Sequence, residues 1–480
     1  MKMKKQAFNP YLPSWEYIPD GEPYVFDGRV YIYGSHDRFN GHTFCMNDYV
    51  CWSAPVDDLG NWRYEGVIYR KIQDPLNPGE TMCLYAPDVT KGPDGRYYLY
   101  YVLDKVSVVS VAVCDTPAGK YEFYGHVRYE DNTLYGDKPG DDPQFDPGVL
   151  TEDGVTHLYT GFCPGGDKSR HGVMYVKLGP DMLTIQGEMK FVVPSTPYAE
   201  GSGYEGHEFF EASSIRKRNG LYYFIYSSTV MHELCYATTD SLDKPFTFRG
   251  VIVSNADMHI DSYKPAEKPM FYGMNNHGSM VEIGGEWYIF YHRHTNGTVF
   301  CRQGCAEKLT FNEDGTIVQA QMTSCGLNGG PLAGEGRYPA YIACNLFCDE
   351  ERLYSGGDPG GGIMMGSKFP RITQDGRDGD EEEGYIMNMT NSSTAGFKFF
   401  DFKNSRVSSI FIRGYGNGIF EVRSTWDGEV LGSFPVSNTN IWTEVPGNVK
   451  MPDGIGSIFF TFKGDGNPDF GGFELTQTPG

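Results

Sequence analysis

The stretch Asp27-Gly28-Arg29-Val30-Tyr31-Ile32-Tyr33 leads from a turn pair into a short aromatic strand. Four similar stretches follow, and they begin at Asp94, Asp153, Asn219 and Gly284. Each places Gly second and an aromatic-rich apolar run after it. Asp-Gly, Asn-Gly and Gly-Gly pairs between apolar runs are strong hairpin signals, because type I′ turns need positive φ at both central residues. We therefore predict a β-hairpin at each copy.

The spacing of these copies predicts the fold. Counted between the turn glycines, the period is about 59 to 67 residues, which is long enough for a four-stranded sheet with its loops. Five such units predict a five-bladed β-propeller, because radial packing of the blades hides the sheet edges. A row of separate small domains is the alternative, and the even period disfavours it.

Length and composition agree with an all-β protein of two domains. The chain has 480 residues, of which 15% are aromatic, and 61 are Gly; many short strands joined by tight turns need such a composition. The formal net charge of −22 would repel nucleic acid and anionic membrane surfaces. We therefore expect no nucleic-acid or membrane partner.

The N-terminus and the cysteines bear on localisation. Residues Met1 to Ala7 contain lysines without an apolar stretch behind them, and no run of 18 apolar residues occurs. The 11 cysteines are scattered without a regular framework, a pattern that suits reduced thiols better than disulfides. We expect a cytoplasmic protein.

One polar residue stands seven to nine positions before each turn glycine, at the head of the strand that enters the hairpin. These residues are Asp20, Asp88, Asp146, Glu211 and His277. The innermost strand of each propeller blade lines the central channel, so equivalent positions should converge on the axis. Such clusters of like charge usually mark chemistry or a cation. A turn role for Asp88, in a Pro-Asp pair, and a core role for His277 stay open.

Several motifs at these positions resemble glycoside hydrolase family 43, the five-bladed group of β-xylosidases, α-L-arabinofuranosidases and arabinanases. The resemblance covers roughly residues 9 to 320. The motifs are Asn9-Pro10, Pro19-Asp20, Tyr85-Ala86-Pro87-Asp88, Phe145-Asp146-Pro147, Phe209-Phe210-Glu211-Ala212-Ser213 with Ile215-Arg216-Lys217, His277-Gly278 and Tyr291-His292-Arg293.

The resemblance implies three catalytic roles: Asp20 as general base, Glu211 as general acid and Asp146 as the residue that tunes the pKa of the acid. Inverting hydrolysis needs a base and an acid roughly 6.5 to 9.5 Å apart, with water between base and sugar. Glu22 is a rival for the base, because the first motif reads Pro19-Asp20-Gly21-Glu22-Pro23. Register favours Asp20, which lies eight residues before its turn glycine.

The resemblance also implies substrate contacts. It suggests that Arg293 reaches the sugar in the deepest subsite, with a structural pairing to a channel carboxylate as the alternative. Tyr85 and Asp88 are expected beside the sugar, and His36 either reaches it or anchors a loop. His277 matches the family's central histidine, which is often held near a metal ion or water cluster. No cofactor is expected to be required, and one structural calcium ion near the axis, at His277, is allowed.

The last third of the chain predicts a second domain. Residues 1–325 form the expected propeller, the Gly-rich residues 326–337 the expected linker, and residues 338–480 a jelly-roll-like β-sandwich. The sandwich resembles a family 6 carbohydrate-binding module, with Glu383 to Ile386 and Asn440 to Trp442 where such modules keep sugar-stacking aromatics. Packing on the propeller and subunit contact are the alternatives. The acidic stretch Asp378 to Glu383 is most simply a solvated loop.

The sequence thus predicts an inverting, exo-acting hydrolase that releases L-arabinofuranose or D-xylose from oligosaccharides derived from arabinoxylan or xylan. The expected partner is a small oligosaccharide, and a homo-oligomer stays open. An endo-arabinanase, or another activity of the family such as a galactosidase, is the alternative within the fold. A catalytically silent sugar-binding propeller is the alternative from another class.

Overall fold

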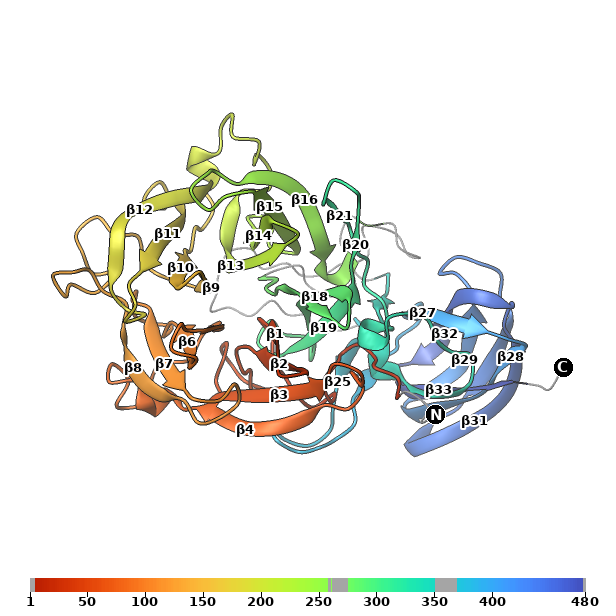
Figure 1. The fold of residues 1–480 in the computed structure, drawn as a ribbon. Coiled ribbons are helices and arrows are strands. Elements are labelled where there is room, and N and C mark those ends of the chain that lie inside the picture. Colours follow the sequence, from red (N-terminus) through yellow and green to blue (C-terminus); the bar gives the residue numbers. More distant parts are fainter. Residues whose placement is uncertain (1–4, 258–259, 261–274, 350–368, 478–480) are drawn as a thin grey trace.

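The computed structural model describes residues 5–257, 260, 275–349 and 369–477. The described elements are strands and short 3-10 helices. This part of the chain holds no helix with the length and apolarity needed to cross a membrane. Five sheets surround a common centre, and a second group of sheets packs at one side of the ring (Figure 1). The all-β prediction of a propeller followed by a sandwich is confirmed.

Blades 1 to 4 are four-stranded antiparallel meanders that follow the chain. Blade 1 comprises β1 (Glu22–Phe26), β2 (Arg29–Tyr33), β3 (Tyr49–Pro55) and β4 (Arg63–Tyr69). Blade 2 comprises β5 (Asp88–Lys91), β6 (Tyr97–Tyr101), β7 (Ser110–Cys114) and β8 (Glu122–His126). Blade 3 comprises β9 (Gly148–Glu152), β10 (Val155–Thr160), β11 (Gly172–Leu178) and β12 (Ile185–Pro194). Blade 4 comprises β13 (Phe209–Arg218), β14 (Leu221–Ser228), β15 (Glu233–Thr239) and β16 (Thr247–Ser254).

The described part of blade 5 has three strands, β17 (Met280–Ile283), β18 (Glu286–His294) and β19 (Arg302–Lys308). The N-terminal segment lies along the free edge of β19. The side-chain amide of Asn9 donates to the carbonyl of Ala306 and accepts from its N–H, at 2.9 and 2.8 Å. A backbone bridge between Gly21 and Gly278 joins blade 1 to blade 5. The two ends of the ring are thereby closed.

The predicted hairpin turns occur at all five copies. Positive φ at both turn residues is found for Asp27-Gly28, Asp153-Gly154, Asn219-Gly220 and Gly284-Gly285, as type I′ turns require. In the second copy only Gly95 has positive φ. There the turn is longer, because the N–H of Gly92 donates to the carbonyl of Arg96.

The C-terminal domain consists of two six-stranded sheets. The first contains β22 (Leu332–Ala333), β24 (Asn345–Phe347), β27 (Thr394–Phe402), β29 (Gly416–Arg423), β30 (Gly432–Val436) and β32 (Gly454–Gly466). The second contains β23 (Gly336–Pro339), β25 (Arg371–Thr373), β26 (Tyr385–Met387), β28 (Ser405–Gly414), β31 (Thr439–Lys450) and β33 (Asp469–Gln477). Phenylalanines such as Phe397, Phe460 and Phe473 fill the space between the sheets.

The expected linker, residues 326–337, is structured. It contains the 3-10 helix η4 (Gly326–Asn328) and strand β22, which pairs with β27 in parallel. Strand β23 begins at Gly336 and pairs with β33. The sandwich sheets therefore start at Leu332, within the segment that the Gly-rich composition suggested as a linker. The hairpin formed by β20 (Thr310–Phe311) and β21 (Ile317–Val318) precedes it.

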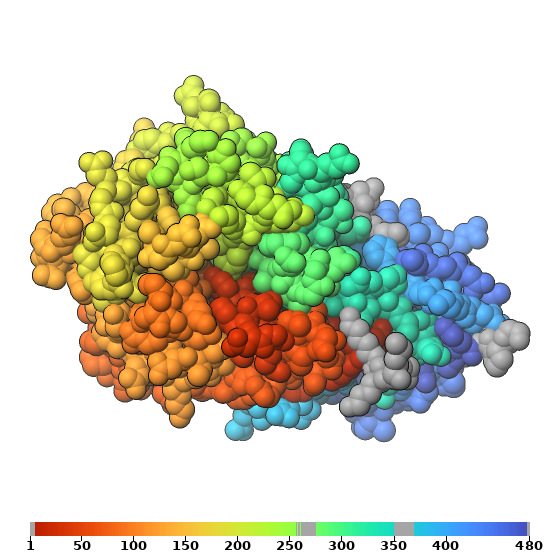
Figure 2. Space-filling model, in the orientation of Figure 1, coloured from red at the N-terminus to blue at the C-terminus, as the bar shows by residue number. Residues whose placement is uncertain are grey.

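The two domains share one continuous hydrophobic core. It runs from Ile289 and Met280 of blade 5 to Ile386 and Phe397 of the sandwich. The ammonium of Lys398 in β27 lies 3.3 Å from Asp257, and both side chains are fully buried. The space-filling view shows the sandwich in blue packed against the side of the ring (Figure 2). Such continuity predicts that the domains are held in a fixed arrangement.

Candidate active site

The heads of the innermost strands bring a group of acidic side chains to the channel. Asp20 and Asp146 lie just before β1 and β9, Glu211 lies in β13 and His277 lies just before β17. Nδ1 of His277 is 3.5 Å from Asp146 Oδ2 and 3.9 Å from Asp20 Oδ1. All four residues are at most 9% exposed. We call these four residues the acid cluster.

The backbone around the acid cluster is strained. Asp20 and Asp146 have φ of 58° and 42°, and Ala212, directly after Glu211, has φ of 68°. Shifts of register between β13 and β14 flank Glu211. Left-handed non-glycine residues cost roughly 1–3 kcal/mol each and concentrate at functional sites. The N–H of Ala212 donates to Asp146 Oδ2 at 3.0 Å, so the turn at Glu211 also orients Asp146.

Asp20 is held as a carboxylate. Nη1 of Arg302 donates to its Oδ1 at 3.0 Å, and Nδ1 of His292 lies 3.3 Å from the same oxygen. Burial alone would raise the pKa of Asp20, but Arg302, His292 and His277 outweigh burial and hold this pKa well below its ordinary value. Asp20 is therefore ionised at neutral pH, as a general base must be.

Glu211, by contrast, is held in its protonated form. Burial raises the pKa of Glu211 well above its ordinary value, and the negative charge of Asp146 raises it further. Burial also raises the pKa of Asp146, to about 7. Burial lowers the pKa of His277, but the surrounding carboxylates outweigh it and raise that pKa to about 9. The acid cluster thus contains both a protonated and an ionised carboxyl group, which is the division of states that acid–base catalysis needs.

Asp146→Asn is expected to move the basic limb of the pH profile of kcat/KM to lower pH. Glu211 must be protonated to act, so activity is lost as pH rises through its pKa. Removing the charge of Asp146 lowers that pKa. Asp153→Asn is the matched control, since Asp153 lies on the β9–β10 turn of the same blade, where Asn tolerates positive φ. A basic limb at the same pH in Asp146→Asn and wild type would contradict this role.

A second, deeper layer of buried charged side chains consists of Glu22, Arg216 and Asp88. Glu22 accepts hydrogen bonds from Arg216 and from the hydroxyl of Ser214. The guanidinium of Arg216 also lies 4.3 Å from the ring centre of Tyr24. Glu22 is fully buried and engaged with a cation. Both Asp20 and Glu22 lie near His277, but only Asp20 also acts by its charge on the pKa values of Asp146 and Glu211, which favours Asp20 as the base.

Asp88 belongs to this deeper layer, where neighbouring blades engage its buried carboxylate. Its carboxylate accepts from the hydroxyl of Tyr24 at 2.6 Å and from the N–H of Val149 at 2.8 Å. Its side chain is fully buried. Burial, with the charge of Glu22, raises the pKa of Asp88 to about 7. Asp88 ties blade 2 to blades 1 and 3, so its role here is structural.

Arg293 lies at the junction of the two domains, and its contacts there disagree with the expected contact to the sugar. Its guanidinium donates to the carbonyls of Tyr341 and Ala343, at 2.6 and 3.1 Å, and to the side chain of Gln303. Successive residues of a strand point to opposite faces, so His292 faces Asp20 while Arg293 faces the sandwich. Arg293 therefore joins the two domains and pairs with no channel carboxylate among its described partners.

His36 anchors a loop. Its Nδ1 lies 2.9 Å from the carbonyl of Asp48, and its Nε2 lies 2.9 Å from Glu16 Oε1. Because both ring nitrogens are engaged, the alternative of sugar binding through His36 is not supported. The sugar contact expected of Tyr85 stays a prediction. Tyr85 is half-buried, and its ring packs edge-on against Phe145, with ring centres 5.5 Å apart.

The sequence analysis missed two residues that contact the candidate general base, Asp20. Arg302 is 3% exposed and His292 is fully buried, and both contact Asp20. Arg302 starts β19, a strand that also contains Gln303, Glu307 and Lys308. The polarity of this strand therefore did not indicate that Arg302 is buried. A buried arginine needs a carboxylate partner, and only the structure identifies Asp20 and Asp37 as its partners.

Two other features lie outside the acid cluster. His207 Nδ1 lies 2.6 Å from Glu233 Oε1, with Cys235 nearby, as a group that offers metal ligands. Tetrahedral zinc with ligands at about 2.0–2.1 Å would hold its nitrogen and oxygen ligands roughly 3.3 Å apart. The shorter distance is that of a hydrogen bond, and the hydroxyl of Ser228 also donates to Glu233 Oε1. We therefore interpret this group as a hydrogen-bonded pair.

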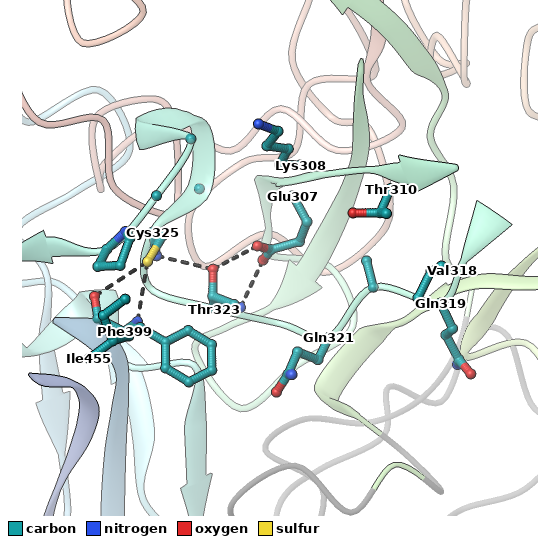
Figure 3. A pocket seen from close by; sticks show the side chains of 15 residues that line it. Glu307, Lys308, Thr310, Val318, Gln319, Gln321, Thr323, Cys325, Phe399 and Ile455 are labelled. Atoms are coloured by element: carbon teal, nitrogen blue, oxygen red, sulfur yellow. Dashed lines mark hydrogen bonds between the residues drawn. The ribbon is translucent and has the colours of Figure 1, made fainter. Parts of the chain in front are cut away.

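A pocket of about 310 Å³ lies where blade 5 meets the sandwich (Figure 3). Glu307, Thr323 and Phe399 line it. Burial raises the pKa of Glu307 to about 8. Its carboxylate accepts from the backbone and the hydroxyl of Thr323, as Figure 3 shows, and from the side chain of Asn9. Glu307 thus fastens the domain junction, and the pocket is separate from the acid cluster.

Comparison with known proteins agrees with this geometry. Residues 18–317 match the model of glycosyl hydrolases family 43. The chain is 68% identical to "Xylosidase/arabinosidase" of Thermoclostridium stercorarium, over 98% of this chain and 99% of the relative.

Solved structures match as well. A β-xylosidase/α-arabinofuranosidase from a compost microbial metagenome, solved with xylotriose in a calcium-free form, is 28% identical. The match covers 65% of this chain and 97% of that chain, with a TM-score of 0.51. An arabinoxylan arabinofuranohydrolase from Bacillus subtilis, solved with cellotetraose, is 22% identical over 99% of both chains, with a TM-score of 0.51, and shares the fold. The matched family model spans the five blades and every member of the acid cluster, and the chain is a glycoside hydrolase that belongs to family 43.

Proposed function

We propose that this hydrolase is an inverting, exo-acting enzyme that releases D-xylose or L-arabinofuranose from short oligosaccharides of xylan or arabinoxylan. The names of its relatives support the choice of sugars. The observation that carries the mechanism is the opposite state of two buried carboxyl groups, with the pKa of Asp20 lowered and the pKa of Glu211 raised.

In the proposed reaction Asp20 accepts a proton from water as the water oxygen attacks the anomeric carbon. Glu211 donates its proton to the glycosidic oxygen as the bond to the leaving sugar breaks. The two transfers leave Asp20 protonated and Glu211 ionised, and exchange with solvent restores both. Asp146 raises the pKa of Glu211 beforehand and is itself oriented by the N–H of Ala212.

Aromatic side chains beside the acid cluster support a sugar substrate. Phe145 and Phe210 directly precede Asp146 and Glu211. The ring of Phe162 lies 5.0 Å from that of Phe145 and 5.3 Å from that of Phe210, between ring centres. Tyr85 also packs against Phe145. Aromatic faces supply large apolar contact area with little loss of side-chain freedom, which suits the apolar face of a pentose ring.

The test compares 4-nitrophenyl β-D-xylopyranoside with the α-L-arabinofuranoside, with Asp20→Asn as the background control. We expect turnover of at least one substrate. Proton NMR of the first product from the β-xyloside should show α-xylose, because direct displacement by water inverts the anomeric carbon. Xylotriose should yield single xylose units from one end. Absence of turnover on both aryl substrates, with folded protein, would remove the pentosidase proposal. β-Xylose as first product would remove the inverting mechanism.

A calcium ion near the axis remains a prediction. Glu22 Oε1 is buried without a hydrogen-bond partner among the described residues and lies 3.8 Å from Nε2 of His277. The oxygen of Glu22 fits an ion that keeps most of its water ligands, since calcium takes 6–8 ligands, mainly oxygens. His277, whose raised pKa favours the protonated ring, would contact the ion through one of those waters. A bound ion would supply positive charge beside the carboxylates. Metal analysis of the purified protein should find one bound calcium ion, and Glu22→Gln should lose it.

A further inference from the structure

The loop between β2 and β3, residues 34–48, orients the arginine beside the base. The buried carboxylate of Asp37 accepts from Nε and Nη2 of Arg302, at 2.8 and 2.9 Å, and from the backbone N–H of the same residue at 3.1 Å. This paired contact fixes the plane of the guanidinium. Its remaining nitrogen, Nη1, then points at Asp20. The position of Asp37 therefore decides where Arg302 meets Asp20.

The sandwich reaches this same loop. Asp378, between β25 and β26, accepts from the N–H of Phe39 at 2.7 Å and from Nδ2 of Asn47 at 3.1 Å. Nδ2 of Asn47 also donates to the carbonyl of Asp37, at 3.0 Å. One side-chain amide thus bridges Asp37 and Asp378. The acidic stretch that suggested a solvated loop contains one carboxylate that docks on the propeller.

Two further contacts from the sandwich support residues 37–40. The hydroxyl of Tyr17 donates to Gln374 at 2.6 Å, and the carbonyl of Tyr17 accepts from the N–H of Asp37. The hydroxyl of Thr373 donates to Asn296 at 2.8 Å, and the amide of Asn296 donates to Asn40. Asp378 therefore contacts this segment of blade 1 directly, whereas Gln374 and Thr373 support it through Tyr17 and Asn296.

We propose that the β25–β26 loop of the sandwich positions the catalytic base: Asp378 holds the β2–β3 loop so that Asp37 keeps Arg302 against Asp20. This inference rests on the proposed role of Asp20. Asp378 acts through other residues and is a positioning residue. A loop that only docked the domain would affect stability alone, whereas a loop that positions the base must change the rate of the chemical step.

Asp378→Ala tests the proposal, and Asp380→Ala is the matched control. Asp380 lies in the same exposed loop, and its described contact is a hydrogen bond from the N–H of Arg377. We expect Asp378→Ala to lower kcat about tenfold with KM within about twofold, because small displacements of catalytic groups cost up to about a hundredfold in rate. Asp378→Asn keeps one acceptor for Phe39 and should lie between Asp378→Ala and wild type.

The possible results separate the two proposals. If Asp20→Asn abolishes turnover but Asp378→Ala and Asp380→Ala share the same kcat, the positioning role is overturned. A rise in KM at unchanged kcat in Asp378→Ala also overturns it, since the loop would then act on sugar binding. If Asp20→Asn keeps its activity, the proposed base is wrong. Melting temperature and circular dichroism check folding, and Asp378→Asn carries the test if the alanine variant fails to fold.

Discussion

Glu211→Gln is expected to lower kcat/KM on xylobiose by about 10³- to 10⁴-fold, and by far less on 4-nitrophenyl β-D-xylopyranoside. General acid catalysis contributes about 10²- to 10⁴-fold. An alkoxide leaving group needs the full proton transfer, whereas nitrophenolate leaves without one. Glutamine has nearly the volume of glutamate but no proton to donate, and it removes a group whose pKa burial and Asp146 hold high.

The measurement is the ratio between the loss of kcat/KM on xylobiose and the loss on 4-nitrophenyl β-D-xylopyranoside. Kinetics on both substrates should show a much larger defect on xylobiose. Glu205→Gln serves as control, because Glu205 lies on the exposed loop before β13 and accepts from backbone N–H groups of that loop. Equal losses of Glu211→Gln on the two substrates would argue that Glu211 is not the acid. Such a result would move that role to another carboxyl of the channel.

Asp20→Asn is expected to lower kcat/KM by up to about 10⁴-fold, and by the same factor on both substrates. Removal of a proton from water does not depend on the leaving group, so the defect should not discriminate between them. Asparagine retains an oxygen that can accept from Arg302 and tolerates the positive φ of this position. The loss therefore reports the missing base.

Asp27→Asn is the matched control for this variant. Asp27 also has positive φ and lies on the β1–β2 turn of the same blade, so the same substitution there should leave the kinetics unchanged. Substantial activity in Asp20→Asn would transfer the role of base to Glu22. In that case Glu22→Gln should show the substrate-independent loss instead.

Much of the fold was determined by local sequence. The turn pairs, from Asp27-Gly28 to Gly284-Gly285, need positive φ, and few other conformations of the chain accommodate them between apolar runs. Their even period then implied closure into a ring. The register of polar residues relative to these turns identified Asp20, Asp146, Glu211 and His277, and the structure brings these four together.

The pairings of the N-terminus and of the expected linker could not be predicted from local sequence. Asn9 completes the edge of β19 through a side-chain amide that pairs with Ala306. Strand β22, inside a Gly-rich stretch, pairs with β27. Both pairings join residues far apart in the chain. No local pattern of glycine or polarity predicts which partner such a segment will find.

The identity of the residues around the base was decided only by tertiary structure. Arg293 and Arg302 are both buried arginines of blade 5. Nothing in the local sequence indicates which of them contacts the catalytic carboxylates. The alternation of side chains in β18 sends Arg293 to the sandwich, whereas Arg302, on β19, meets Asp37 and Asp20. The sequence by itself determined the propeller and the heads of its inner strands, because turn chemistry and periodicity are local. Which cation faces which carboxylate, and the support from Asp378, depended on how two domains pack, because those contacts join distant residues.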